Sequence, residues 1–140
     1  MTKVINLLLV EDDNVDVIEL RRTLDRMGIL YRMKVARNGE EGILALDPGN
    51  NELFSGLPDI VLLDLNMPRM NGLEFLQIIR KKSAWRNIKV FVLTTSDETE
   101  DRTAMRELGV SGYIVKPLKV SNTKSIDAFN LMIDLMNMQN

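Results

Sequence analysis

The sequence predicts an α/β fold in which five helices cover a doubly wound, five-stranded parallel sheet. Five short apolar runs alternate along the chain with five segments whose apolar residues recur every three or four positions. Such alternation is typical of parallel strands joined by right-handed helical crossovers. The chain has 140 residues, of which 45% are hydrophobic and 27% charged, which suits one domain with a full-sized core. We therefore expect a single domain over residues 1–140.

The first half of the chain supplies two strands, two helices and a loop. Its first apolar run is interrupted only by Asn6 and is too short for a typical helix. Asn14 is the expected cap of the following helix, and Gly28 is the expected stop. Pro, Gly and Asn residues then mark a surface loop. The expected segments are strands over 4–10 and 30–36, helices over 15–27 and 39–46, and the loop over 47–58.

The second half of the chain supplies three strands and three helices. An Asn71-Gly72 turn precedes a helix whose basic end, residues 80–82, is favourable at the negative pole of the helix dipole. The next helix has a thin apolar stripe and is stopped by Gly109, which fits a weakly anchored, movable element. The expected segments are strands over 59–63, 90–93 and 112–115, and helices over 73–82, 98–108 and 122–138.

Four of the expected strands end in acidic, hydroxyl or amine side chains. Glu11 and Asp12 follow the first strand, and Asp64 follows the third. Thr94 and Lys116 follow the fourth and fifth strands. In the flavodoxin-like strand order 2-1-3-4-5, the first and third strands are neighbours at the topological switch point. We therefore expect the three carboxylates to lie in one crevice at the carboxyl edge of the sheet.

These groups together suit phosphoryl chemistry, although each alone has an ordinary explanation as a cap or a surface residue. Clustered carboxylates need protonation, solvent or a cation, and oxygen ligands favour a hard ion such as Mg²⁺. Lys116 can neutralise phosphoryl charge, Thr94 can donate a hydrogen bond, and Asp64 remains as the nucleophile. Asp13 and Asp16 are expected to remain helix-start acids.

These motifs resemble the receiver domain of two-component response regulators. The resemblance covers the chain from Val4 to the last helix and rests on five signatures in the family's order. They are the acidic pair within 7–12, the phosphoacceptor segment 63–68 with Gly72, the switch hydroxyl within 93–95, Tyr113, and Lys116-Pro117.

The resemblance implies that Asp64 is the phosphoacceptor of a histidine kinase or phosphotransfer protein, and that the chain is not otherwise an enzyme. Asp64 and Asp12 would be direct Mg²⁺ ligands. Glu11 would act through a water molecule and Asn66 through its main-chain carbonyl. Lys116 would pair with the phosphoryl group.

The resemblance also implies a conformational switch. Thr94 would move toward the phosphoryl oxygens and Tyr113 would turn inward, which would remodel the surface of the fourth helix, fifth strand and fifth helix. The chain would be a receiver domain with no output domain. Its 47–58 loop is longer than in a minimal receiver domain, and in this the chain resembles the small stand-alone regulators that accompany bacterial phytochrome kinases.

Composition excludes several other functions. The formal net charge is −2 with scattered basic residues, so we expect no nucleic-acid binding. The chain has no cysteine and no histidine, so a phosphohistidine must belong to a partner. It lacks a signal peptide and a run long enough to span a bilayer, so we expect a cytoplasmic protein with no membrane contact.

The last helix carries apolar residues around much of its circumference. One stripe that faces a sheet does not need so many, so the helix is either a frayed end or a surface for a homodimer or a kinase. The residues are Ile126, Ala128, Phe129, Leu131, Met132, Ile133, Leu135, Met136 and Met138.

Three alternative functions remain. A phosphatase of the haloacid dehalogenase type also uses an aspartate nucleophile, but it needs a second aspartate two residues later, where this chain has Asn66. A phosphorylation-independent adaptor with the receiver fold is a second alternative, although the aspartate and lysine are both present. A nucleotide-binding flavodoxin-like protein is a weaker one, because no glycine-rich loop follows the first strand.

Overall fold

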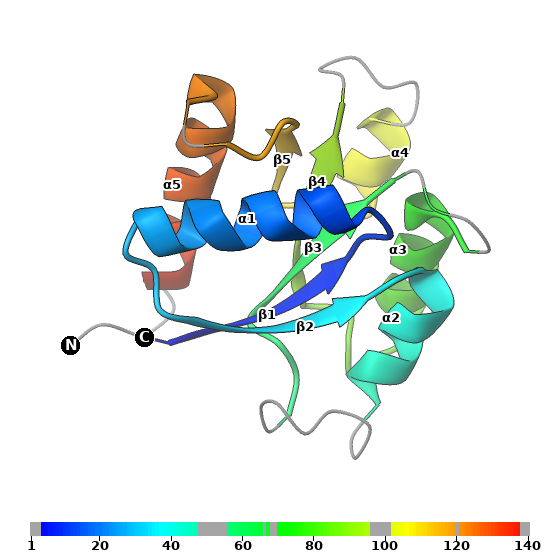
Figure 1. Ribbon diagram of the computed structural model, residues 1–140. Helices are drawn as coiled ribbons and strands as arrows, with labels where there is room; N and C mark the ends of the chain where they lie inside the picture. The colour runs from blue at the N-terminus through cyan, green and yellow to red at the C-terminus, as the bar shows by residue number, and fades with distance from the viewer. Residues whose placement is uncertain are drawn as a thin grey trace.

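The computed structural model describes residues 4–47, 56–65, 67, 70–95, 102–119 and 121–137. Five parallel strands form one sheet in the order β2-β1-β3-β4-β5, and helices cover both of its faces (Figure 1). This confirms the predicted α/β fold and its strand order. The strands are β1 (Ile5–Val10), β2 (Tyr31–Ala36), β3 (Ile60–Asp64), β4 (Lys89–Thr94) and β5 (Gly112–Val115). The helices are α1 (Asn14–Arg26), α2 (Gly39–Leu46), α3 (Gly72–Lys81), α4 (Arg102–Glu107) and α5 (Thr123–Asn137).

The helix starts differ from the predictions in two places. Asp13, not Asn14, caps α1, because Asp13 has an extended backbone and its side chain accepts a hydrogen bond from the Val15 N–H at 2.8 Å. Asn71 caps α3 in a capping box with Glu74, so the expected Asn71-Gly72 turn is the first step of that helix. The predicted start of α4 at residue 98 and most of the 47–58 loop lie outside the described residues.

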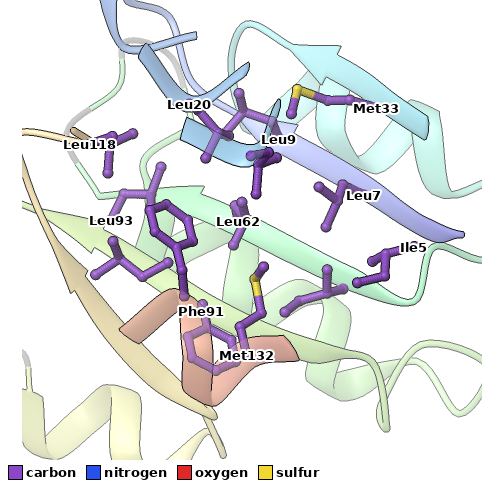
Figure 2. Packing of buried hydrophobic residues seen from close by; sticks show 14 of the residues in the cluster. Ile5, Leu7, Leu9, Leu20, Met33, Leu62, Phe91, Leu93, Leu118 and Met132 are labelled. Atoms are coloured by element: carbon purple, nitrogen blue, oxygen red, sulfur yellow. The ribbon is translucent and has the colours of Figure 1, made fainter. Parts of the chain in front are cut away.

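Two hydrophobic layers hold the helices against the sheet. α1 and α5 pack on one face and α2, α3 and α4 on the other (Figure 1). Alternate strand residues point to opposite faces, so Leu7 and Leu9 enter the first layer while Leu8 and Val10 enter the second. Figure 2 shows the first layer, where Phe91 lies among residues of the strands and helices around it. Burial on both faces explains why the strands are continuous apolar runs.

α5 turns one stripe of its apolar residues toward the sheet. Phe129, Met132 and Met136 are fully buried in the first layer. Leu131 lies on the opposite side and is 48% exposed, whereas Met138 lies outside the described residues. The use of this outer side in a homodimer stays a prediction.

No helix in the described part of the chain has the length and apolar character needed to cross a membrane.

The strand register brings the predicted site residues to one edge. Val10 at the end of β1 pairs with Leu63, which precedes Asp64. Asp64 pairs with Leu93 of β4, and Thr94 pairs with Val115 of β5. The residues that follow these strands therefore meet at the carboxyl edge of the sheet, as parallel pairing requires.

Candidate phosphoryl and cation site

An acidic cluster lies where β1 and β3 end. Glu11, Asp12 and Asp64 each place a carboxylate oxygen within 4.8 Å of the others. Glu11 and Asp64 are buried, with exposed fractions of 0% and 5%, while Asp12 is exposed. Two acids are thus held in the sheet edge, and the third lies on the open side of the same cleft. The sequence prediction that these three residues converge is confirmed.

The donor set of this cluster fits a hard divalent cation. All three candidate ligands are carboxylates, the class that Mg²⁺ prefers. One of their oxygens, Glu11 Oε2, is fully buried and already lies 3.0 Å from the Lys116 ammonium, so this end of the cluster is built to stabilise positive charge. Asn66, the predicted carbonyl ligand, lies outside the described residues.

Lys116 supplies the positive charge of the site. Its Nζ lies 2.7 Å from Asp16 Oδ2, 3.0 Å from Glu11 Oε2 and 3.7 Å from Asp64 Oδ1. Burial opposes the charged form of Lys116, but the bonds to Asp16 and Glu11 and the charge of Asp64 outweigh it and raise its pKa above the ordinary lysine value. The ammonium therefore stays charged and balances part of the acidic cluster.

The Glu11 carboxyl has a pKa above the ordinary glutamate value. Burial raises its pKa to about 7, the attraction of Lys116 opposes that rise, and the negative charge of Asp64 adds to it. Glu11 Oε1 accepts a hydrogen bond from the Asp13 N–H at 3.2 Å. In the absence of a cation, this acid holds a proton more strongly than an exposed glutamate does.

Thr94 and Tyr113 lie on the β4 and β5 side of the site. Thr94 is the buried last residue of β4, and its carbonyl accepts a hydrogen bond from the Lys116 N–H at 2.7 Å. Tyr113 is partly buried, and its hydroxyl lies 3.4 Å from the carbonyl oxygen of Arg102. The Arg102 guanidinium lies 4.2 Å from the centre of the tyrosine ring, within cation–π distance. Tyr113 thus joins β5 to the first residue of α4.

Buried polar groups hold the segment that carries Lys116, which follows β5 and has a cis peptide bond to Pro117. The Ser125 hydroxyl lies 2.6 Å from the Val115 carbonyl oxygen and 2.9 Å from that of Pro117. The Asn122 side-chain amide donates to the same two carbonyls. The Thr23 hydroxyl of α1 donates to the Leu118 carbonyl at 2.6 Å. These bonds place the lysine, and the sequence analysis assigned none of them.

Gly72 permits a close approach of α3 to the end of β3. A Cβ atom at this position would lie 2.7 Å from the Asp64 carbonyl oxygen and 2.8 Å from the Leu65 Cα. The Gly72 N–H donates to the Leu65 carbonyl at 3.2 Å. Only glycine fits this position without moving the backbone that leads out of Asp64.

Asp16 is the site residue that the sequence analysis missed. It does lie in the first turn of α1, as expected of a helix-start acid, but its carboxylate is also the nearest acid to the Lys116 ammonium. Local spacing carries no signal for this pair, since 100 positions separate the two residues. Asp16 is thus the helix-start acid that was expected, and it is also a partner of Lys116.

Comparisons with known proteins agree with this fold. A family model described as the response regulator receiver domain matches residues 7–126. The probable methanogenesis regulatory protein FilR2 of Methanothrix harundinacea (strain 6Ac) is 35% identical over 120 residues, which are 84% of this chain and 76% of FilR2. The uncharacterized transcriptional regulatory protein YcbL of Bacillus subtilis (strain 168) is 35% identical over 115 residues, which are 81% of this chain and 45% of YcbL. The solved structure of the bacteriophytochrome response regulator RtBRR superposes with a TM-score of 0.79 and is 33% identical in sequence. The alignment covers 93% of this chain and 78% of the RtBRR chain.

Proposed function

This chain belongs to the response regulator receiver domain family, and from that premise we propose that it accepts a phosphoryl group on Asp64. Receiver domains are signalling modules that interact with histidine kinases or phosphotransfer proteins. The observation that carries the proposal is the arrangement around Asp64. Two further carboxylates and the Lys116 ammonium, 3.7 Å from Asp64 Oδ1, surround its side chain.

The proposed transfer uses Asp64 as the nucleophile. One of its carboxylate oxygens attacks phosphorus and forms the new P–O bond. The P–N bond of the partner's phosphohistidine breaks, and its electron pair returns to the imidazole nitrogen. Lys116 is close enough to balance charge on the phosphoryl oxygens.

The acidic cluster would hold Mg²⁺ during this transfer. Asp12 and Asp64 would bind through carboxylate oxygens, Glu11 through water and Asn66 through its carbonyl. When bound, Mg²⁺ neutralises negative charge on the transferring group. The same positive charge would favour the ionised form of Glu11, whose pKa is raised chiefly by burial.

The signal would leave through a population shift at the surface formed by α4, β5 and α5. A phosphoryl group adds roughly −1.5 to −2 charge and three acceptor oxygens, and it shifts a two-state element only through contacts that differ between the states. Thr94, buried at the end of β4, would supply one such contact. Tyr113 would supply a second difference between the two states. If its ring turned inward, its contacts with Arg102 of α4 would break.

We further propose that the chain acts as a response regulator for a phytochrome-type histidine kinase. The similarity to the bacteriophytochrome response regulator RtBRR supports this choice of partner. A homodimer through the outer side of α5, where Leu131 is exposed, would fit the same proposal.

The test is the intact mass of the protein after incubation with acetyl phosphate and Mg²⁺, compared with Asp64→Asn. We expect a phosphoryl adduct on the native chain alone, which is lost when Mg²⁺ is chelated. Both proteins are first shown to be folded by circular dichroism. A native chain that is folded and binds Mg²⁺ but takes up no phosphoryl group would refute the proposal and favour a phosphorylation-independent adaptor.

A further inference from the structure

The contact between Asp16 and Lys116 has no role in the phosphoryl transfer described above. Asp16 lies in the first turn of α1, and its Oδ2 is 2.7 Å from the Lys116 Nζ. That distance is shorter than those from the same ammonium to Glu11 and Asp64. Lys116, which is expected to bind the phosphoryl group, therefore has as its nearest acid a residue of α1 and not one of the acidic cluster at the ends of β1 and β3.

Lys116 cannot serve all of its acceptors once Asp64 is phosphorylated. An ammonium has three N–H donors, and three carboxylates already lie within 3.7 Å of it. A phosphoryl group on Asp64 adds three strong acceptor oxygens and more than a unit of negative charge. At least one of the three carboxylates must then lose its contact with the Lys116 ammonium.

Asp16 is the partner that can be released at the least cost. The Glu11 side chain is fully buried, so water cannot replace a lost ion pair there, whereas the side chain of Asp16 is 15% exposed. Asp16 also lines the open cleft together with Asp12 and Glu19. A released Asp16 carboxylate can turn toward solvent without leaving a buried charge.

We propose that Asp16 is a positioning residue that holds Lys116 in the unphosphorylated protein and competes with the phosphoryl group for its ammonium. The proposal rests on the proposed function, since it needs a phosphoryl group on Asp64. Asp16 acts through Lys116 and does not touch the reacting atoms. By holding the lysine, it weakens the hold of the site on the phosphoryl group.

The first test measures the affinity for beryllofluoride, a tetrahedral analogue of the phosphoryl group, by calorimetry with saturating Mg²⁺. Asp16→Asn removes the charge and keeps the shape of the side chain, so Lys116 becomes available to the analogue. We expect this variant to bind about tenfold more tightly than the native chain, the scale of one charge-assisted hydrogen bond. Asp16→Glu keeps the carboxylate and should restore near-native affinity.

Glu19→Gln is the matched control. Glu19 lies three residues further along α1, lines the same cleft and contacts Lys119 at 3.8 Å instead of Lys116. This variant loses the same unit of charge but leaves the Asp16 contact intact, so its affinity should equal that of the native chain. An equal gain in Glu19→Gln and Asp16→Asn would reduce the effect to general charge and overturn the proposal.

A second readout follows Lys116 directly and needs no phosphoryl group. In the metal-free protein, the ¹⁵N-detected ammonium signal of Lys116 should exchange its protons with water faster in Asp16→Asn than in the native chain. An unchanged exchange rate would overturn the claim that Asp16 holds the lysine.

The two readouts separate failure of this inference from failure of the proposed function. A native chain that binds beryllofluoride while Asp16→Asn binds it equally or more weakly would overturn only the role of Asp16. A folded native chain that neither binds beryllofluoride nor accepts a phosphoryl group from acetyl phosphate would overturn both.

Discussion

Replacement of Gly72 by alanine should damage both the stability of the fold and the chemistry of Asp64. The added Cβ would lie 2.7 Å from the Asp64 carbonyl oxygen and 2.8 Å from the Leu65 Cα. Both atoms belong to the backbone, so neither can rotate away as a flexible side chain could. The first turn of α3 or the end of β3 must therefore move.

The size of the effect follows from two opposing contributions. Overpacking of a tight interior contact costs about 1–3 kcal/mol, while alanine gains up to about 1 kcal/mol over glycine in helix propensity. Because Gly72 is the first residue of α3, only part of that gain applies. The net loss of unfolding free energy should be about 1–2 kcal/mol, which lowers the melting temperature by roughly 5 °C for a chain of this size. A displacement of Asp64 by even part of an ångström should also slow phosphorylation by acetyl phosphate at least about tenfold.

Gly112→Ala separates the local effect from the loss of stability. Its Cβ would lie 2.7 Å from the Phe91 ring, a similarly short contact but with a side chain, and Gly112 lies on β5, two strands away from Asp64, where it pairs with Phe91 rather than with Thr94 at the carboxyl end of β4. Thermal unfolding by circular dichroism should show that both variants are destabilised, whereas the initial rate of phosphorylation should fall only in Gly72→Ala. A Gly72→Ala protein with native stability and rate would refute the close approach. Equal slowing in both variants would show that the effect is global.

Two further predictions concern other parts of the structure. Glu11 has its pKa raised by burial from 4.5 to about 7, so between these values the folded chain keeps a proton that the unfolded chain has released. The metal-free protein should therefore lose up to ~3 kcal/mol of stability as the pH rises from 5 to 8. Denaturant titrations at several pH values measure this loss, which Glu11→Gln should not show. The same pH dependence of the unfolding free energy in both proteins would contradict the prediction. Arg80 donates hydrogen bonds to the carbonyls of Leu108 at 2.6 Å, Ile88 at 2.8 Å, Arg86 at 3.1 Å and Gly109 at 3.3 Å. Arg80→Met should lower the unfolding free energy by about 2–3 kcal/mol and speed amide exchange at the end of α4, and native exchange rates there would argue against a clamp between α3 and α4.

Most of the fold could be predicted because local chemistry and tertiary packing agree in this chain. The helix over 39–46 and the strand over 112–115 have the predicted bounds, since their apolar patterns match the faces that they bury. The cap assignment at the start of α1 failed for a local reason. Asp13 and Asn14 are both good capping residues, and only the backbone conformation decides which one precedes the first helical turn.

The sequence by itself determined the strands, the helices and the convergence of Glu11, Asp12 and Asp64. Short-range apolar periodicity marks each element, and the acids directly follow strands whose parallel order brings their ends together. Only the tertiary structure decided the contact between Asp16 and Lys116, the bonds that hold the Lys116 segment, and the approach of Gly72 to Asp64. Each of these depends on the distance between two different segments of the chain. Such a distance is set by the packing of the whole core, and no local pattern of residues encodes it.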